Sequence, residues 1–191
     1  VFNNAGVALG ATVEDMSYED FEWLMGINFW GVVHGTKAFL PHLKAAGEGH
    51  IVNVSSVFGL IGVPTQSAYN AAKFAVRGFT EALRQELEME GGRVSCTSVH
   101  PGGIKTNIAR NARMGAGVEK ITGDVDKARR DFEKMFRTTP EEASQTILKG
   151  VKGNKRRVLI GSDARAIDSM QRLMPTAYQR IMVAGQKMMR K

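Results

Sequence analysis

The 191-residue sequence predicts an α/β fold, a doubly wound parallel sheet with helices on both faces. Short β-branched runs alternate with longer segments whose apolar residues recur at helical spacing. The runs are continuously apolar, as expected for strands that are covered on both faces. No internal repeat or low-complexity linker interrupts this order, so we expect residues 1–191 to form a single domain.

The first half of the chain predicts three strands and two long helices. Val1–Asn3 is expected to be the end of a strand, and a helix follows over 17–46 with Ser17 as its N-cap. The β-branched run His50–Ser56 predicts the next strand. An apolar stripe predicts a second helix over 69–90, and a Gly-Gly pair ends it. The apolar run Val94–Val99 predicts a third strand.

The second half is less regular, and its most ambiguous part is the polar, glycine-containing segment 107–137. Beyond a helix near 124–136, we expect a short helix over 140–151, a strand over 157–161 and a C-terminal helical segment that is interrupted at Pro175 and spans 163–191.

Composition and charge narrow the class of protein. No run approaches the ~20 apolar residues of a membrane span. Cys96 is the only cysteine, which excludes an intrachain disulfide and favours a cytoplasmic location.

Charge is unevenly distributed along the chain. Residues 1–104 carry 6 Lys and Arg against 10 Asp and Glu, whereas residues 105–191 carry 20 Lys and Arg against 9 Asp and Glu. A basic half is compatible with nucleic acid or anionic lipid. However, no nucleic-acid-binding motif accompanies the charge, so we expect a solvated surface and no nucleic acid partner. The four histidines show no metal-ligand pattern.

Polar residues stand at the end of each predicted strand of the first half: NNAG after the first, SS after the second and HPGG after the third. In parallel α/β sheets, ligands bind beyond the carboxyl ends of the strands. We therefore expect the chemistry of the protein at this edge of the sheet.

The sharpest motif is Tyr69-Asn-Ala-Ala-Lys73, which places a phenol and an ammonium one helical turn apart on one face. A free tyrosine has a pKa of about 10, and a nearby ammonium is expected to lower it. Such a tyrosine can exchange a proton with a carbonyl or alcohol oxygen. By itself the Tyr-x-x-x-Lys spacing is a weak signal, since most instances are surface pairs.

Ser56 and Asn28 strengthen this reading. Ser56 lies thirteen residues before Tyr69 at the end of a strand, where its hydroxyl could hold a reacting oxygen. Strand neighbours face opposite ways, so only one of Ser55 and Ser56 can face such a pocket, and the other is expected to be a structural hydroxyl. Asn28 falls on the apolar stripe of the first helix, which predicts a buried, hydrogen-bonded side chain.

These segments together resemble the short-chain dehydrogenase/reductase family. The resemblance rests on NNAG at 3–6, IN at 27–28, VNVSSVFG at 52–59, YNAAK at 69–73 and HPGGIKT at 100–106. Their order and spacing match in one register. The resemblance covers residues 1–106 and implies a Rossmann-type domain that interconverts a secondary alcohol and a ketone with a nicotinamide cofactor.

The resemblance also implies roles for individual residues. Tyr69 would be the general acid/base, Lys73 would lower its pKa and bind the nicotinamide ribose, Ser56 would orient the substrate oxygen, and Asn28 would hold a water of a proton relay. The cofactor would further contact Asn3, Ala5 and Gly6 on its adenosine side and Pro101, Gly102, Ile104 and Thr106 on its nicotinamide side. Gly6 and Gly102 would allow close backbone approach to the cofactor.

The family's glycine-rich phosphate-binding turn does not occur in this sequence. The resemblance places it upstream of NNAG, so we expect the chain to be the C-terminal part of such a domain. The residue that selects NAD or NADP would also lie upstream. A rival reading is therefore a non-catalytic family remnant that acts as a subunit-association module.

The substrate side is expected to be apolar. Phe58, Val63 and Gln66 follow Ser56, and the 107–137 segment is a candidate substrate lid with Met114, Met135 and Phe136. The resemblance implies a homodimer or homotetramer through the helices at 17–46 and 69–90. The Met-rich basic segment 163–191 is a candidate for weak contact with a membrane surface, although packing against the domain or a partner subunit is the favoured alternative.

Overall fold

The computed structural model describes residues 1–189, and residues 190–191 of the expected C-terminal segment lie outside it. A four-stranded parallel sheet forms the centre, in the order β1-β3-β4-β6. Its strands are β1 (Phe2–Asn3), β3 (Gly49–Val54), β4 (Val94–Pro101) and β6 (Arg157–Ile160). The parallel α/β fold is therefore confirmed, and β4 runs two residues further than the apolar pattern predicts.

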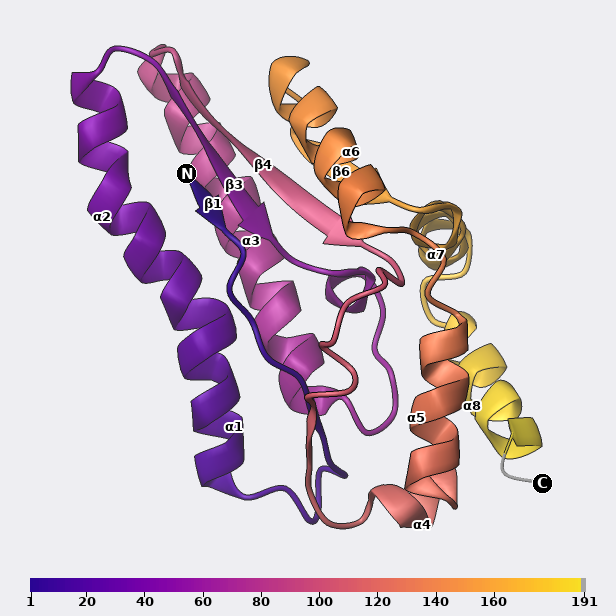
Figure 1. Ribbon diagram of the computed structural model, residues 1–191. Coiled ribbons are helices and arrows are strands. Elements are labelled where there is room, and N and C mark those ends of the chain that lie inside the picture. Colours follow the sequence, from indigo (N-terminus) through magenta and orange to yellow (C-terminus); the bar gives the residue numbers. More distant parts are fainter. Residues whose placement is uncertain (190–191) are drawn as a thin grey trace.

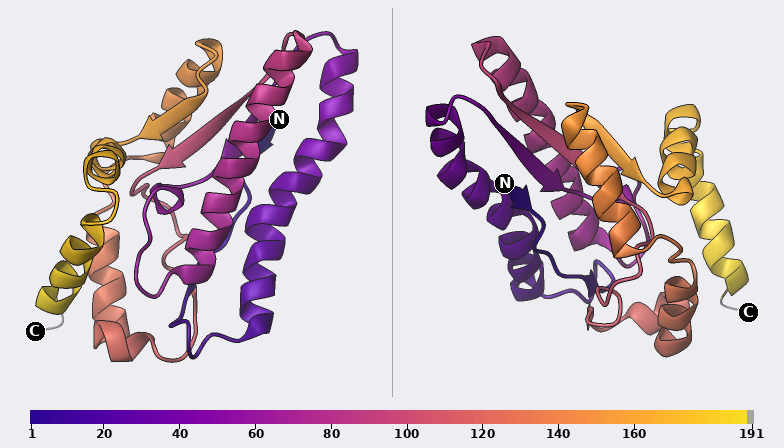
Figure 2. Two further views of the ribbon diagram at one scale, coloured as in Figure 1. Left: turned by 180° about the vertical axis from the view of Figure 1, so that it is seen from behind. Right: turned by 45° about the horizontal axis from the view of Figure 1, so that its top comes forward.

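Helices cover both faces of this sheet, as Figures 1 and 2 show. The long helices α2 (Gly31–Ala45) and α3 (Ser67–Glu90) lie on one face, and α6 (Pro140–Lys152) lies on the other. Successive residues of β3 point alternately into the hydrophobic cores on the two faces of the sheet. Ile51 packs with Leu83 and Leu87 of α3, whereas Val52 packs with Val158 of β6 and with α6. This two-sided burial explains why the strands are continuously apolar.

The predicted helix over 17–46 is continuous but not uniformly α-helical. Helix α1 (Tyr18–Met25) passes through a π-helical turn, η1 (Gly26–Trp30), into α2. Ser17 accepts a hydrogen bond from the amide of Asp20, as its predicted N-cap role requires. The π turn surrounds Asn28. Helical periodicity does not predict such a turn, and π turns often occur at functional sites.

The segment 107–137 is more ordered than its sequence predicts. It contains β5 (Arg113–Met114), which pairs in parallel with β2 (Leu9–Gly10), and two helices, α4 (Val118–Thr122) and α5 (Val125–Lys134). The small β2-β5 pair was not predicted, because two-residue strands carry no periodic signal.

Ionic and aromatic contacts anchor this segment to α1 and to the turn before it. The Arg113 guanidinium lies 3.9 Å from the centre of the Trp23 ring and 2.6 Å from the Asp20 carboxylate. Lys120 lies 2.9 Å from Asp15. The base of the candidate lid is thus tied down on the side of the molecule that carries α1 (Figure 1).

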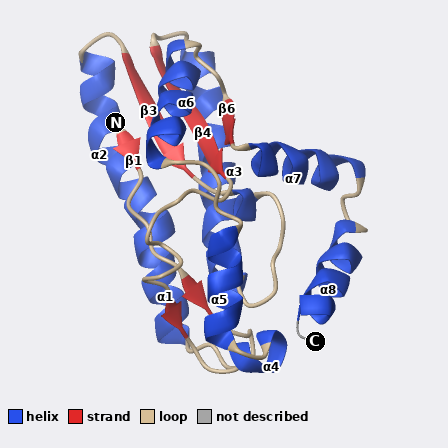
Figure 3. Ribbon diagram, turned by 45° about the vertical axis from the view of Figure 1, so that its right-hand side comes forward, coloured by secondary structure: helices blue, strands red, loops and turns tan. Residues whose placement is uncertain are grey.

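The C-terminal segment forms two helices, α7 (Ser162–Leu173) and α8 (Tyr178–Met189), with the predicted break around Pro175. In Figure 3, α8 points away from the sheet, and its C-terminal end lies near α4. Tyr178 is its buried residue, and the Tyr178 hydroxyl accepts a hydrogen bond from the Gly62 amide at 3.0 Å. Within residues 1–189, no helix is both long and apolar enough to cross a bilayer.

Gly35 of α2 offers a test of how the first strand is held. A Cβ there would collide with the Asn3 amide, which bonds Thr36 and Asn53. We expect Gly35→Ala to lower the free energy of unfolding by about 1–3 kcal/mol through overpacking. Denaturant unfolding measures this. Gly78→Ala is the control, because nothing lies within 4 Å of its Cβ position. It should be neutral or stabilising by up to about 1 kcal/mol.

Candidate active site

The carboxyl ends of β3 and β4 are joined directly. The Ser55 amide donates to the Val99 carbonyl at 2.8 Å, and His100 Nδ1 lies 3.0 Å from the Ser56 carbonyl oxygen. Beyond this edge lies the single turn η2 (Val57–Gly59), visible beside the strand ends in Figure 1. The Ser56 hydroxyl caps η2 by accepting from the Phe58 amide, so its own proton is free to be donated to another oxygen.

Helix α3 places Tyr69 and Lys73 beside this strand end. The Lys73 ammonium is 5.6 Å from the centre of the Tyr69 ring and donates to the Val54 carbonyl at 3.0 Å. Lys73 is only 4% exposed. Burial lowers the pKa of Lys73 to about 8, because the charged form loses its hydration. The ammonium still predominates at neutral pH.

Tyr69 differs from the sequence expectation of a lowered pKa. Burial raises the pKa of Tyr69 to about 12, and a hydrogen bond with Ser56 opposes that rise. Desolvation of the phenolate therefore outweighs the favourable groups near it. Helical spacing brings Tyr69 and Lys73 together, but it carries no information on how deeply the phenol is buried. At neutral pH the phenol and the ammonium both hold their protons.

Asn28 is fully buried, as its place on the apolar stripe predicts. Its side-chain amide donates to the Val7 carbonyl and accepts from the Val7 amide, both at 2.8 Å. The turn around Gly6 is thereby held against η1. A Cβ on Gly6 would lie 3.3 Å from Asn28 Oδ1 and 3.7 Å from Lys73 Nζ. The NNAG turn therefore lies directly beside the buried ammonium.

The predicted adenosine-side residues fall into two groups. Ala5 and Gly6 are exposed beyond the end of β1, where their backbone is accessible to a ligand. The Asn3 side chain instead donates to Thr36 Oγ1 and Asn53 Oδ1 and fixes β1 to α2 and β3. Asn3 is thus a structural link through its side chain, and only its backbone remains for a ligand.

The predicted nicotinamide-side residues follow β4 in one loop. Pro101 ends the strand, Ile104 packs partly into the core beside α6, and Thr106 is exposed. Gly102 lies against a side chain from a distant part of the chain. The space where its Cβ would lie is filled by the carboxylate of Asp163, and the close approach that requires glycine there comes from this side chain.

Three hydrogen-bonding residues near the site gave too little signal in the sequence. Asn70 fixes the loop after η2, since its amide donates to the carbonyls of Phe58 and Ile61 and accepts from the Val63 amide. The other two residues are His100 and Asp163. They contact residues about 40 and 60 positions away, which no local pattern reveals.

Ser55, by contrast, behaves as expected of a structural hydroxyl, because it donates to the Lys73 carbonyl at 2.7 Å.

Aromatic side chains form one wall next to Tyr69. The Phe58 ring contacts Tyr69 edge-on at 5.9 Å between centroids and Phe132 at 6.2 Å, and Phe132 in turn contacts Phe136 at 5.0 Å. The expected apolar lid residue Met135 is instead largely exposed. Phe132, which the sequence did not single out, takes its place.

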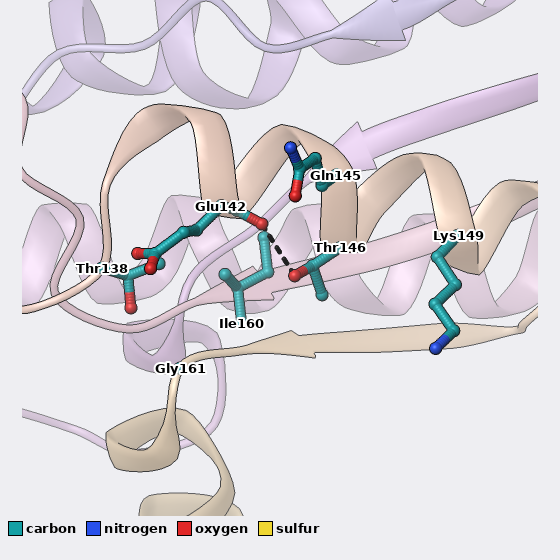
Figure 4. A pocket seen from close by; sticks show the side chains of 7 residues that line it. All are labelled: Thr138, Glu142, Gln145, Thr146, Lys149, Ile160 and Gly161. Atoms are coloured by element: carbon teal, nitrogen blue, oxygen red, sulfur yellow. Dashed lines mark hydrogen bonds between the residues drawn. The ribbon is translucent and has the colours of Figure 1, made fainter.

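A separate hollow of about 450 Å³ lies between α6 and β6 (Figure 4). The Thr146 hydroxyl on its wall donates to the Glu142 carbonyl within the same helix. None of the sequence-predicted site residues lines it. The complete lining is Thr138, Glu142, Gln145, Thr146, Lys149, Ile160 and Gly161.

The layered parallel sheet, with a Tyr-Lys helix at its carboxyl edge, defines the class of Rossmann-type α/β proteins. The family model for short chain dehydrogenase matches residues 1–117. The chain therefore belongs to the short-chain dehydrogenase/reductase family.

Individual relatives agree with this assignment. The chain is 52% identical over 185 residues to SadH of Mycobacterium tuberculosis, covering 97% of this chain and 66% of SadH. A Burkholderia phymatum short chain dehydrogenase/reductase in complex with NAD superposes with a TM-score of 0.77 at 27% identity, over 90% of this chain and 64% of that one. A Burkholderia cenocepacia short chain dehydrogenase in complex with NADP gives 0.74 at 25% identity, over 95% and 67%.

The buried His100 makes acid stability a test of the site's geometry. Desolvation lowers the pKa of His100 to about 4, below the ordinary 6.5 that it regains on unfolding. Between these two pH values the imidazole of His100 is protonated in the unfolded chain and neutral in the folded chain. Stability is lost as pH falls from about 6.5 towards 4, by up to roughly 3 kcal/mol.

We expect the stability advantage of the wild-type protein over His100→Asn to shrink as pH falls through this window. Urea unfolding at several pH values measures it. The same substitution at the exposed His42 is the control and should keep the wild-type slope. A constant difference between wild type and His100→Asn would contradict the burial of a neutral imidazole.

Proposed function

We propose that the protein containing this chain is an NAD- or NADP-dependent oxidoreductase that interconverts a secondary alcohol and a ketone. The chain spans 66% of the length of SadH. One observation carries the proposal: the buried Lys73 ammonium and the partly buried Tyr69 phenol lie together beside a serine hydroxyl at the carboxyl end of β3. A surface Tyr-Lys pair would have neither the desolvated ammonium nor the adjoining strand end.

The protonation of the pair favours proton donation to a carbonyl oxygen. Ser56 would donate a hydrogen bond to that oxygen and hold it beside Tyr69. The Tyr69 proton would pass to the oxygen as charge develops on it, and the resulting phenolate would be stabilised by the Lys73 ammonium 5.6 Å from the ring centre. In the reverse direction the phenolate would take the alcohol proton. A bound nicotinamide would supply or accept the hydride.

The residues present fit the nicotinamide half of such a cofactor. Within residues 1–189 the Lys73 ammonium donates to one acceptor, the Val54 carbonyl, so two of its three N–H groups remain for ribose hydroxyls. The exposed backbone of Ala5 and Gly6 adjoins this ammonium. This sequence contains no glycine-rich turn for the cofactor's phosphates. Solved members of the family hold NAD or NADP, and the proposal covers both cofactors.

Tyr69→Phe tests the proton-transfer role. Removal of the hydroxyl should lower kcat by roughly 10²- to 10⁴-fold, the usual contribution of general acid–base catalysis. Binding of NADH or NADPH, followed by fluorescence, should be unchanged because the ring is retained. Tyr18→Phe, at an exposed tyrosine of α1, is the matched control. Full turnover by Tyr69→Phe would exclude the assigned mechanism.

We further propose an apolar substrate. The Phe58, Phe132 and Phe136 rings lie in sequence from the phenol towards the candidate lid, so the surface next to the reacting oxygen is aromatic. Such a wall favours the apolar body of a steroid, retinoid or fatty carbonyl over a small charged sugar.

Truncation of the exposed edge of this wall should weaken substrate binding. We expect Phe132→Ala to raise KM for bulky apolar ketones by roughly 5- to 10-fold, as the loss of aromatic contacts implies, with little change in kcat. Steady-state kinetics on ketones of increasing apolar length measure this. Leu148→Ala, at a half-exposed apolar residue of α6, is the control. Preference for small charged sugars, with no effect of Phe132→Ala, would overturn the substrate class.

The remaining expectations stay proposals. A homodimer or homotetramer through α2 and α3 is supported by exposed large aromatics: Phe39 on α2, Phe74 on α3 and Trp30 at the end of η1, which are 41–51% exposed. A cytoplasmic location rests on the lone thiol of Cys96, which is buried and free. Contact of α8 with a membrane surface rests on its exposed Ile181 and Val183 and on the positive charge of the segment.

The rival function is a non-catalytic subunit-association module. The same exposed aromatic helices would serve it. Burial of the Lys73 ammonium beside the Tyr69 phenol lowers the stability of the fold, and a subunit-association module would not need it. We therefore favour the enzyme.

A further inference from the structure

The loop after β4 is gripped by a side chain from the far end of the chain. The Gly103 amide donates to Asp163 Oδ2 at 2.6 Å. This is a short, charge-assisted hydrogen bond. Among the hydrogen bonds of residues 1–189, it is the only one between a side chain and the backbone of residues 101–106. Asp163 lies in the first turn of α7, sixty residues from the loop that it holds.

Two glycines make room for this carboxylate. Gly102 and Gly161 each direct their missing Cβ at Asp163, so any other residue at either position would collide with it. Gly161 also has φ of +95°, which lets the chain turn sharply from β6 into α7. This turn directs the Asp163 side chain towards the loop that follows β4, the strand next to β6 in the sheet.

The same loop is bonded on its other side to the end of the candidate lid. The Gly103 carbonyl accepts from the amides of Arg137 and Thr138, and the Lys105 amide donates to the Thr138 carbonyl. The Gly102 amide donates to the Ile160 carbonyl of β6. Asp163 thus holds one side of a peptide whose other side carries the lid, and it ties α7 to both.

We propose that Asp163 is a positioning residue that fixes the loop of Pro101–Thr106 for the nicotinamide half of the cofactor. The inference rests on the proposed function, since it assigns that loop to the cofactor. A nicotinamide that lies against a backbone loop needs that backbone held in one conformation before binding. The Asp163 carboxylate, which accepts from the Gly103 amide and packs against Gly102 and Gly161, keeps the loop in one conformation.

The test uses the full-length protein and compares Asp163→Ala with Asp163→Asn. We expect Asp163→Ala to weaken NADH or NADPH binding by roughly 10-fold, as the loss of a charge-assisted hydrogen bond implies. Asp163→Asn keeps an acceptor oxygen and should lie between Asp163→Ala and wild type. Fluorescence titration gives the dissociation constants without any need for turnover.

Hydrogen exchange at the amides of residues 102–106 supplies the readout that separates positioning from general stability. We expect faster exchange there in Asp163→Ala, with α6 and β4 unchanged. Asp168→Asn is the matched control, because it removes the same charge from the same helix but faces Arg157 and Arg172. It should lower thermal stability and leave cofactor affinity and loop exchange at the wild-type level.

The outcomes are separable. Wild-type cofactor affinity in both Asp163 variants would overturn the role of Asp163 and leave the proposed function standing. Faster exchange spread over α7 and β6, with equal weakening by Asp168→Asn, would reduce Asp163 to a fold-stabilising residue and also overturn it. Failure of the wild-type protein to bind either nicotinamide cofactor would instead overturn the proposed function.

Discussion

The buried ammonium of Lys73 is the constraint on which the candidate site depends. Its Nζ donates to the Val54 carbonyl, its own carbonyl accepts from Ser55, and Gly59 must be glycine because a Cβ there would meet that carbonyl. These contacts fix the register of α3 against the end of β3. Once Lys73 is placed, helical geometry puts Tyr69 one turn away, beside Ser56.

The burial of this site changes the pKa values of both groups in a way that their proximity alone would not. It lowers the pKa of Lys73 and raises the pKa of Tyr69, because both charged forms lose hydration. At neutral pH both groups therefore hold their protons, which is the state that the proposed proton donation requires. In that proposal a carbonyl oxygen that gains negative charge is the acceptor, and the aromatic wall beginning at Phe58 would contact the apolar body of the substrate.

The sequence predicts those parts of the structure that follow from local pattern. Apolar runs such as Val94–Val99 and the stripe of α3 predict the strands and helices, and the Tyr69–Lys73 spacing predicts a shared helical face. Burial depth and long-range contacts have no such pattern. The raised pKa of Tyr69, the inward turn of Asn3 and the grip of Asp163 on Gly103 each depend on how distant elements pack. The short pairing of β2 with β5 is invisible for the same reason.

The ionisation of Lys73 is the most direct measure of whether this site is the buried proton-transfer centre inferred from its geometry. Its side chain can be titrated by heteronuclear NMR with labelled lysine, with the signal assigned from its absence in Lys73→Arg. A midpoint near the pKa of about 8 is expected from desolvation against β3. A midpoint at the ordinary 10.5 would show a solvated ammonium and contradict the burial of Lys73 beside Tyr69.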